Sequence, residues 1–505
     1  MTVLLTRLRA SCKPGVVHDW AALERDLKRF LSPKAVVSRR EELLVYDCDG
    51  LTMDRHAPPL AVLPRSTEEV AAIVAACHRY SIPFVARGSG TGLSGGALVE
   101  EDALLIVTSR MRRILDVDLS NQTITVEPGV INSWVTRAVA GDGFYYAPDP
   151  SSQVVCSIGG NVAENSGGVH CLKYGVTSNH VLSMQVVLPD GQVMQLGRDL
   201  SETCAIDLRG AFIGSEGTLG IATEITLRLL PAPQEVAVLL ADFPSMEAAG
   251  EAVRRITSAG VLPAGLEIMD HTCIEAVNAA FAEEEYPPNA GAVLLIELDG
   301  QALEVKEAVE LARCLCREAG AGRVREAWDE TERARLWRGR KSAISALGRQ
   351  CPSYYLQDGV VPRTALPSVL AAIDRLSTDH GLVVANVFHA GDGNLHPLIL
   401  YRASDPGVNE KVKTLGAAIM ELCLEAGGSI SGEHGVGSDK RCFLDRMFSE
   451  DDLATMKRLR LAFDPDGLAN PGKIFPTPKS CGESQRRFVA LQSSGRRLPN
   501  EAVVF

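Results

Sequence analysis

A glycine-rich stretch at residues 88–96, called here the phosphate loop, most constrains what this chain can fold into. Five of its nine residues are glycine, and Ser89, Thr91 and Ser94 fill most of the gaps. A backbone with so few Cβ atoms can curl its N–H groups around an anion, as a phosphate-binding nest requires. The stretch therefore predicts a site for a phosphate group, with an ordinary surface loop as the alternative.

The same stretch also fits the dinucleotide-binding fingerprint G-x-G-x-x-G, at Gly90, Gly92 and Gly95. That fingerprint needs a helix directly after the glycines, because the helix N-terminus holds the pyrophosphate. Here the chain runs on into residues 104–107, Leu-Leu-Ile-Val, which predict a strand, as residues 82–86 do before the loop. We therefore reject a Rossmann-type site and keep the phosphate nest.

Two further glycine-rich loops are predicted at residues 157–168 and 212–221. Each places small residues where a flat ligand can lie close against the backbone. Because ordered glycine costs chain entropy, three such loops in one region indicate a large bound cofactor.

Eight motifs in order make the chain resemble a known family. The motifs are ARGSGTGLSGGA, APDPSS, SIGGNVAENSGG, KYGVTSNHVL, GSEGTLGI, FHAGDGNLHP, SGEHGVG and NPGKIF, spread over residues 40–478. They resemble the FAD-linked 2-hydroxyacid dehydrogenases, flavoproteins of the vanillyl-alcohol oxidase type, and are most similar to glycolate oxidase flavin subunits and D-lactate dehydrogenases. The resemblance implies an α+β fold, with a two-part FAD-binding domain and an α+β substrate domain, or cap.

The expected domain organisation has five parts, with Pro231 and Pro233 near the main boundary. They are an N-terminal helical segment (1–55), the FAD-binding domain (56–235), the cap with its metal site (236–466), a return to the flavin domain (467–478) and a disordered tail (479–505). Within the cap, strands at 236–240, 266–269 and 293–298 alternate with helices at 246–258, 274–281 and 303–318. That alternation predicts helices on one face of a sheet.

Composition excludes several kinds of partner. The 505 residues carry 51 basic and 63 acidic side chains, a net charge of -12, which repels nucleic acid and anionic lipid. Thirteen cysteines without a CxxC pair favour a reducing compartment and exclude an iron–sulfur cluster of the usual spacings. No apolar run approaches the roughly 20 residues of a membrane span. We expect a cytoplasmic protein that reaches a membrane only through a partner.

A second informative stretch lies at residues 386–397. Asp392-Gly393 between two apolar runs predicts a two-residue hairpin turn, in which His389 pairs with His396. Opposed residues share a sheet face with Cβ atoms about 5 Å apart, so the two imidazoles can hold one divalent metal. A hydrogen-bonded histidine pair is the alternative.

The resemblance assigns roles around this pair. It implies metal binding by His389, His396 and Glu433, with zinc or manganese as the expected ion, and general-base catalysis by His434. A histidine that only supports the metal site is the alternative for His434. Arg340 matches the family's carboxylate-binding arginine, whereas the charge run at residues 333–341 also fits a solvated helix face.

The resemblance also implies the residues that contact the flavin. They are Gly88, Ser89, Gly90, Thr91, Gly92, Pro148, Asp149, Ser151, Gly159, Gly160, Asn161, Asn165, Glu216, Gly217, Thr218, Ile221 and Asn470. Relatives with covalent flavin use a histidine or cysteine in or near the phosphate loop, and none stands there, so we expect non-covalent FAD.

The expected reaction is oxidation of glycolate or another small D-2-hydroxyacid to the 2-oxoacid. Members that act on 2-hydroxyglutarate carry lysine where this chain has Leu356, which disfavours longer diacids. Electrons would leave to an iron–sulfur partner subunit, a quinone or a cytochrome. The alternatives are a D-lactate dehydrogenase that works alone and a catalytically silent flavin subunit.

Overall fold

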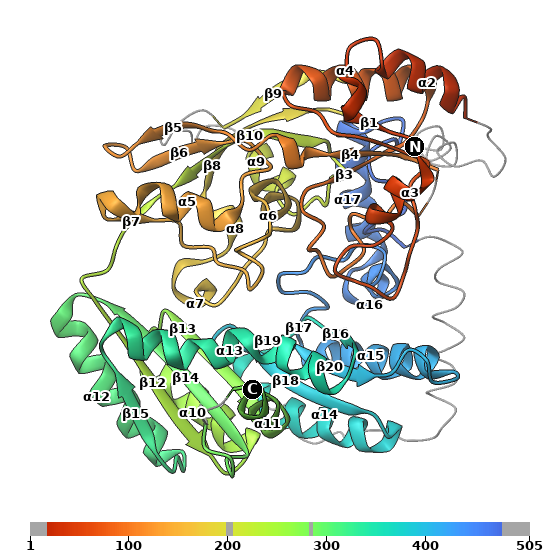
Figure 1. Cartoon of the computed structure of the whole chain (residues 1–505). Coiled ribbons are helices and arrows are strands. Elements are labelled where there is room, and N and C mark those ends of the chain that lie inside the picture. The colour runs from red at the N-terminus through yellow and green to blue at the C-terminus, as the bar shows by residue number, and fades with distance from the viewer. Residues whose placement is uncertain (1–17, 101, 198–205, 282–285, 477–505) are drawn as a thin grey trace.

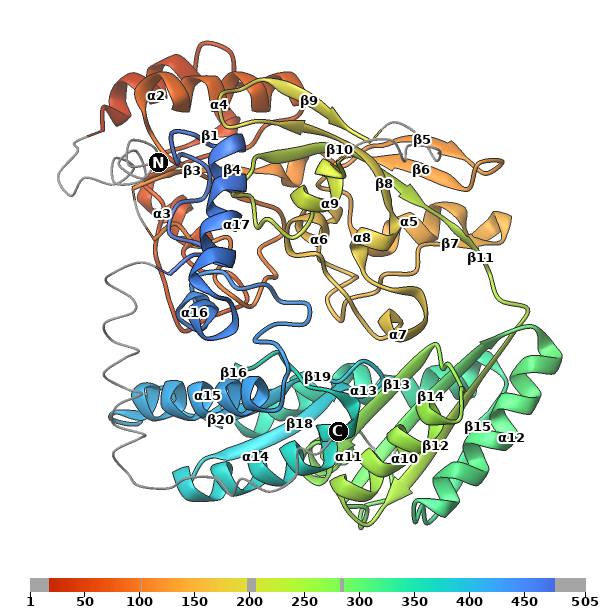
Figure 2. The ribbon, with the colours of Figure 1, turned by 180° about the vertical axis from the view of Figure 1, so that it is seen from behind.

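The computed structural model describes residues 18–100, 102–197, 206–281 and 286–476. Figures 1 and 2 show two halves: a flavin half built from the first half of the chain plus its C-terminal helices, and a cap built from the middle of the chain. The predicted disordered tail lies outside the described residues.

The flavin half contains a four-stranded and a five-stranded sheet. The first has the order β1 (Val36–Val37), β2 (Leu60–Val62), β4 (Leu104–Val107) and β3 (Phe84–Arg87). The second has the order β5 (Ile114–Asp118), β6 (Thr123–Val126), β10 (Ile221–Arg228), β8 (Val181–Val187) and β9 (Val193–Leu196). β7 (Phe144–Tyr145) pairs with β11 (Leu230–Pro231). The helices are α2 (Trp20–Leu27), α3 (Arg40–Leu43), α4 (Thr67–Tyr80), α5 (Asn132–Val139), α6 (Ile158–Glu164), α7 (Cys171–Tyr174), α8 (Thr177–His180), α9 (Leu208–Phe212), α16 (Leu444–Met447) and α17 (Glu450–Phe463).

The phosphate loop leaves the end of β3, and the chain then reaches β4, which runs parallel to β3. The described residues between these strands contain no helix, which confirms the rejection of a Rossmann-type site. α4 precedes β3, and Ser66 caps this helix by accepting a hydrogen bond from Glu69 N at 3.3 Å. The phosphate loop thus connects two buried strands.

One predicted loop is wrong, because residues 158–164 form helix α6. Its glycines serve close packing: a Cβ on Gly159 would lie 2.6 Å from the Pro128 Cβ. The helix ends at Asn165, which adopts the left-handed conformation at φ 55°. Glycine density here reflects a helix pressed against a neighbouring segment.

The cap is built on a nine-stranded sheet. Its strand path is β15 (Val324–Ala327), β12 (Glu235–Phe243), β14 (Ala292–Gly300), β13 (Gly265–Asp270), β18 (Val383–His389), β19 (Asn394–Leu395) and β17 (Gly359–Val360), with β20 (Pro397–Tyr401) pairing with β18 and β16 (Ser353–Leu356). The helices are α10 (Met246–Ser258), α11 (His271–Ala280), α12 (Ala302–Glu318), α13 (Glu330–Gln350), α14 (Leu366–His380) and α15 (Val408–Glu425).

Helices cover both faces of this sheet, so the predicted one-sided cover is wrong. Along β12, Leu239 belongs to the core shared with α10, α12, α14 and α15, whereas Val238 and Leu240 belong to the core shared with α11 and α13. A strand buried on both faces is a continuous apolar run, and residues 236–240 are one.

After α17 the chain returns to the flavin half beside β3. Phe84 N donates to the carbonyl oxygen of Leu468 at 2.9 Å, and Asn470 N donates to that of Phe84 at 2.8 Å. The described cysteines are free thiols. Within the described ranges, every helix is too short or too polar to cross a membrane.

Candidate active site

The two predicted metal-binding histidines lie at strand ends: His389 is the last residue of β18, and His396 lies between β19 and β20. His389 pairs with Asn394, so the predicted pairing with His396 is wrong by two residues. The turn is longer than predicted because Gly393, at φ 79°, lies so close to the Val361 carbonyl oxygen that a Cβ would collide with it. A two-residue shift keeps side chains on the same sheet face, and the two imidazole centroids are 5.0 Å apart.

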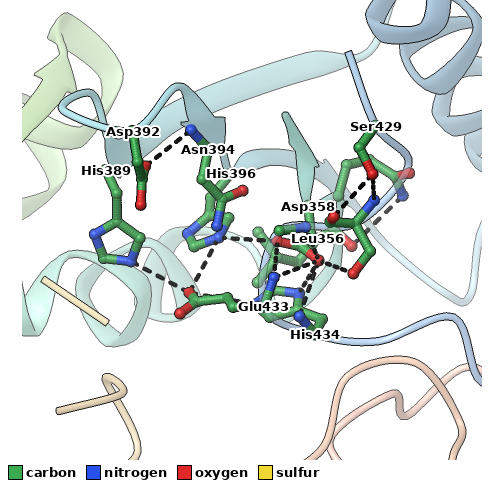
Figure 3. Close-up of polar contacts among 12 residues, drawn as sticks. Leu356, Asp358, His389, Asp392, Asn394, His396, Ser429, Glu433 and His434 are labelled. Atoms are coloured by element: carbon green, nitrogen blue, oxygen red, sulfur yellow. Dashed lines mark hydrogen bonds and ion pairs between the residues drawn. The ribbon is translucent and has the colours of Figure 1, made fainter. Parts of the chain in front are cut away.

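Glu433 approaches both imidazoles from the loop after α15 (Figure 3). Its Oε1 atom lies 3.2 Å from His389 Nε2 and 3.4 Å from His396 Nε2. One donor atom from each of the three residues lies within 4.8 Å of the others. The fold therefore brings the predicted ligand set together.

Electrostatics keep this carboxylate ionised. Burial favours its neutral form, but the neighbouring His389, His396 and His434 outweigh burial and lower the pKa of Glu433 to about 2. Burial would also lower the pKa of His389, yet the carboxylates of Glu267 and Glu433 raise it well above its usual value. Glu267 Oε1 lies 2.6 Å from His389 Nδ1 and fixes that ring.

Arg340 lies behind this cluster and does not line the cavity described below. Its side chain is only 5% exposed, and Nη2 lies 2.6 Å from Glu267 Oε2. The adjacent Lys341 is exposed and lines the cavity. Arg340 thus contacts the carboxylate that holds His389, and the predicted alternative of a solvated helix face does not describe this residue.

Asp358, which the sequence did not single out, holds the backbone that carries Glu433 and His434. It is fully buried and accepts hydrogen bonds from Ser431 Oγ at 2.6 Å, His434 N at 2.9 Å and Lys440 Nζ at 3.0 Å. It also accepts from the backbone N–H groups of Gly432 and Glu433. Its only signal in the sequence is a lone acid before a glycine, in the strand-forming run that follows Tyr354 and contains Leu356.

His434 follows Glu433 and lines the cavity. Its ring stacks on His396 with centroids 4.9 Å apart, and its buried Nδ1 has no hydrogen-bond partner. Burial, only partly opposed by Asp358, lowers the pKa of His434 to about 4. At neutral pH this imidazole is uncharged and can accept a proton.

A cavity of about 720 Å³ is lined by both halves of the molecule. Histidines 396 and 434, Glu433 and Leu356 form part of its cap side. Among the predicted flavin contacts, its lining includes Gly88, Ser89, Gly90, Thr91, Gly92, Ser151, Gly159, Gly160, Asn161, Glu216, Gly217 and Ile221.

The other five predicted flavin contacts stand behind that lining. Pro148 O accepts from Asn132, and Asn165 Oδ1 accepts from Ser178 N. Asp149 pairs with His170, and the Thr218 hydroxyl donates to the Ser215 carbonyl oxygen. The Asn470 side chain donates to the carbonyl oxygens of Gly96 and Glu216.

The phosphate-loop end of the cavity fits a phosphate-bearing cofactor. Arg87 Nη1 is buried without a hydrogen-bond partner, and Ser157 Oγ and Ser215 Oγ are likewise unpaired. A Cβ on Gly90, at φ 71°, would displace the Arg87 guanidinium. Unpaired buried donors around a glycine loop are what a phosphate would satisfy.

Comparisons with known proteins show the family of the chain. Residues 58–197 match the family described as "FAD binding domain", and residues 232–474 match "FAD linked oxidases, C-terminal domain". The chain is 51% identical over 499 residues to the glycolate oxidase subunit GlcD of Escherichia coli K12, covering 99% of each chain. It is 33% identical over 428 residues to a D-lactate dehydrogenase of Anaerostipes hadrus, covering 83% of this chain and 89% of that protein.

Solved structures extend the likeness to the whole fold. The 4-ethylphenol oxidase of Gulosibacter chungangensis superposes with a TM-score of 0.76 at 20% identity, covering 92% of this chain and 100% of that chain. From the two domain matches and the close relatives, the chain belongs to the FAD-linked oxidases, flavoproteins of the vanillyl-alcohol oxidase type.

Proposed function

We propose that this enzyme uses FAD to oxidise glycolate or another small D-2-hydroxyacid to the corresponding 2-oxoacid. The observation that carries the proposal is His434, an uncharged base on the cavity wall beside two histidines and a carboxylate. Relatives named glycolate oxidase subunit and D-lactate dehydrogenase support the substrate class.

We infer that His389, His396 and Glu433 hold a divalent metal, zinc or manganese. Ligands about 2.0–2.2 Å from a tetrahedral ion lie about 3.3–3.6 Å apart. The 3.2 Å and 3.4 Å separations between Glu433 and the two histidines support such a site. A metal held there would bind the substrate hydroxyl and lower its pKa.

Side chains of the protein itself would take the hydroxyl proton and bind the substrate carboxylate. The His434 imidazole would take the hydroxyl proton of the bound acid, and a flavin in the cavity would supply the acceptor for the α-hydrogen as a hydride. Lys341, on the cap side of the cavity, supplies the cation for the substrate carboxylate in place of Arg340. Leu356 offers an apolar wall, with no charge for a second carboxylate.

The electrons then pass to an acceptor outside this chain, for which we propose an iron–sulfur partner subunit, a quinone or a cytochrome. The relatives named as a subunit of glycolate oxidase support the first of these. The cysteine pattern supports it too, because no pair has the spacing of a cluster site.

The test is anaerobic reduction of the purified flavoprotein. Glycolate, D-lactate, L-lactate and D-2-hydroxyglutarate are added separately while the flavin band near about 450 nm is recorded. We expect bleaching by glycolate or D-lactate, and none in a His434→Ala variant that still binds FAD. A wild-type flavin that no hydroxyacid bleaches, with added zinc or manganese, would favour the silent-subunit alternative.

A further inference from the structure

Glu216 connects the two halves of the molecule at the active site. It belongs to the turn between α9 and β10 in the flavin half, and it is only 5% exposed. Its Oε1 accepts a hydrogen bond from Val436 N and its Oε2 from Gly437 N, both at 2.7 Å. These N–H groups lie in residues 433–437, called here the His434 loop.

The His434 loop is therefore held by one carboxylate from each half. Asp358 of the cap accepts from the N–H groups of Glu433 and His434. Glu216 accepts from the two N–H groups at the other end of the loop. Hydrogen bonds from an anion to backbone N–H groups are short and strong, so the two residues together fix the path of the loop.

The surroundings of Glu216 show that its position is specified. Its backbone adopts φ 51°, which is unusual for a residue other than glycine. Asn470 Nδ2 donates to the Glu216 carbonyl oxygen at 2.6 Å and to that of Gly96 at 2.9 Å. Asn470 thereby ties this turn to the phosphate loop, so the turn cannot change its conformation without moving that loop as well.

Contact between the loop and this turn is tight. A Cβ on Gly435 would collide with Glu164 Oε2 and would lie 2.9 Å from Glu216 Oε1. Burial raises the pKa of both Glu164 and Glu216, but the N–H groups of Val436 and Gly437 oppose the shift at Glu216. Glu164, whose pKa is raised well above its usual value, is therefore the neutral partner and does not repel its neighbour. Gly435 is the residue that lets the loop approach this closely.

We propose that Glu216 is a positioning residue, which holds the His434 loop against the flavin-binding half so that His434 faces the cavity shared by both halves. The role of His434 rests on the proposed function. The contact between Glu216 and the loop does not.

The first variant is Glu216→Gln, which turns an N–H donor toward one of the two backbone N–H groups. Hydrogen–deuterium exchange at Val436 and Gly437 should quicken at least tenfold, with the cap sheet unchanged. The limiting rate of flavin reduction should fall at least tenfold, while the Kd for the hydroxyacid changes less than threefold. Unchanged exchange at these two amides, or equal loss of stability throughout the protein, overturns the proposal.

The second variant is Gly435→Ala, with Gly260→Ala as its matched control. Both glycines have φ 81°, but a Cβ at Gly260 has nothing within 4 Å. Gly435→Ala should reproduce the loss of rate, and Gly260→Ala should keep the wild-type rate; equal rates in the two variants contradict the proposal. If no hydroxyacid reduces the wild-type flavin, yet Glu216→Gln still frees both amides, the proposed function fails and the positioning contact stands.

Discussion

Asp49 is a buried carboxyl group beside the phosphate loop, and its titration makes the stability of the FAD-free protein depend on pH. Its Oδ1 accepts from Leu51 N at 2.9 Å, but Oδ2 is buried without a partner. Burial raises the pKa of Asp49 to about 6, although Arg87 opposes the shift. The folded state therefore binds more protons than the unfolded state between about pH 4 and pH 6, so stability falls as pH rises through that window.

Asp49→Asn should remove this penalty. At pH 4 the variant and the wild type should be equally stable, and above pH 6 the variant should be more stable by up to about 3 kcal/mol. Urea unfolding of the FAD-free proteins at pH 4 and pH 7.5 measures the difference. An equal difference at both pH values would show that Asp49 ionises normally.

Cys156 lines the cavity and is the thiol to examine for a covalent bond to flavin. Burial raises the pKa of Cys156, which keeps the thiol protonated and weakly nucleophilic. Acid precipitation should therefore release all FAD into the supernatant, equally from the wild type and from Cys156→Ser. Yellow pellets from the wild type but not from the variant would identify a covalent bond at this residue.

For single residues, the sequence predicted which residues lie at the site better than it predicted where their side chains point. The resemblance named His389, His396, Glu433 and His434, and the fold brings them together. It also named Arg340, whose guanidinium turns away from the cavity to Glu267. Neighbouring residues on a helix point about 100° apart, so the choice between Arg340 and Lys341 depends on how α13 packs, which no local pattern states.

Helix α13 carries these two cations on different faces, and the difference is testable. Arg340→Met leaves the buried Glu267 short of its partner and should lower the free energy of unfolding by about 3–5 kcal/mol. Lys341→Met should leave stability near that of the wild type but raise the Kd for the hydroxyacid about 10- to 100-fold, as expected for loss of a hydrogen bond to a charge. Chemical unfolding and substrate titration of the flavin spectrum measure the two effects.

The opposite pattern, weak binding in Arg340→Met with unchanged stability, would return the carboxylate-binding role to Arg340. Lys341→Arg serves as the control because it keeps the charge and should bind the acid within a fewfold of the wild type.

Elements with strong periodicity were predictable, whereas those shaped by tertiary contacts were not. The predicted helix at 246–258 is α10, and the predicted strand at 104–107 is β4. α6 was missed because Gly159 and Gly160 signal a loop locally, while packing against Pro128 decides otherwise. The hairpin register was missed because the contact between Gly393 and Val361, residues far apart in sequence, sets the turn.

For the whole molecule, the two halves have largely separate apolar cores. Two core clusters surround the cap sheet, and three others lie in the flavin half. Leu51, Val169, Leu444 of α16 and Leu453 of α17 cross from the flavin half into the cap clusters. The FAD-free protein should therefore unfold in two calorimetric transitions. FAD should raise both, because the cavity is lined by both halves. Scanning calorimetry with and without FAD checks this, and one transition in the FAD-free protein would contradict it.

Fold class followed from the eight motifs, and the two-sided cover of the cap sheet was already present in the apolar run of β12. The sequence alone could not give the cross-contacts between halves, such as Glu216 with the His434 loop, because 220 residues separate Glu216 from Val436.

The return of the chain to β3 also sets how late in synthesis the turn beside the phosphate loop is completed. Asn470 completes the turn at Gly96 and Glu216, and 374 residues separate it from Gly96. At about 5–20 residues per second, the phosphate loop leaves the ribosome roughly 20 to 75 seconds before the segment that completes it. The cap is synthesised in that interval, so the turn at Gly96 and Glu216 stays incomplete until Asn470 has left the ribosome.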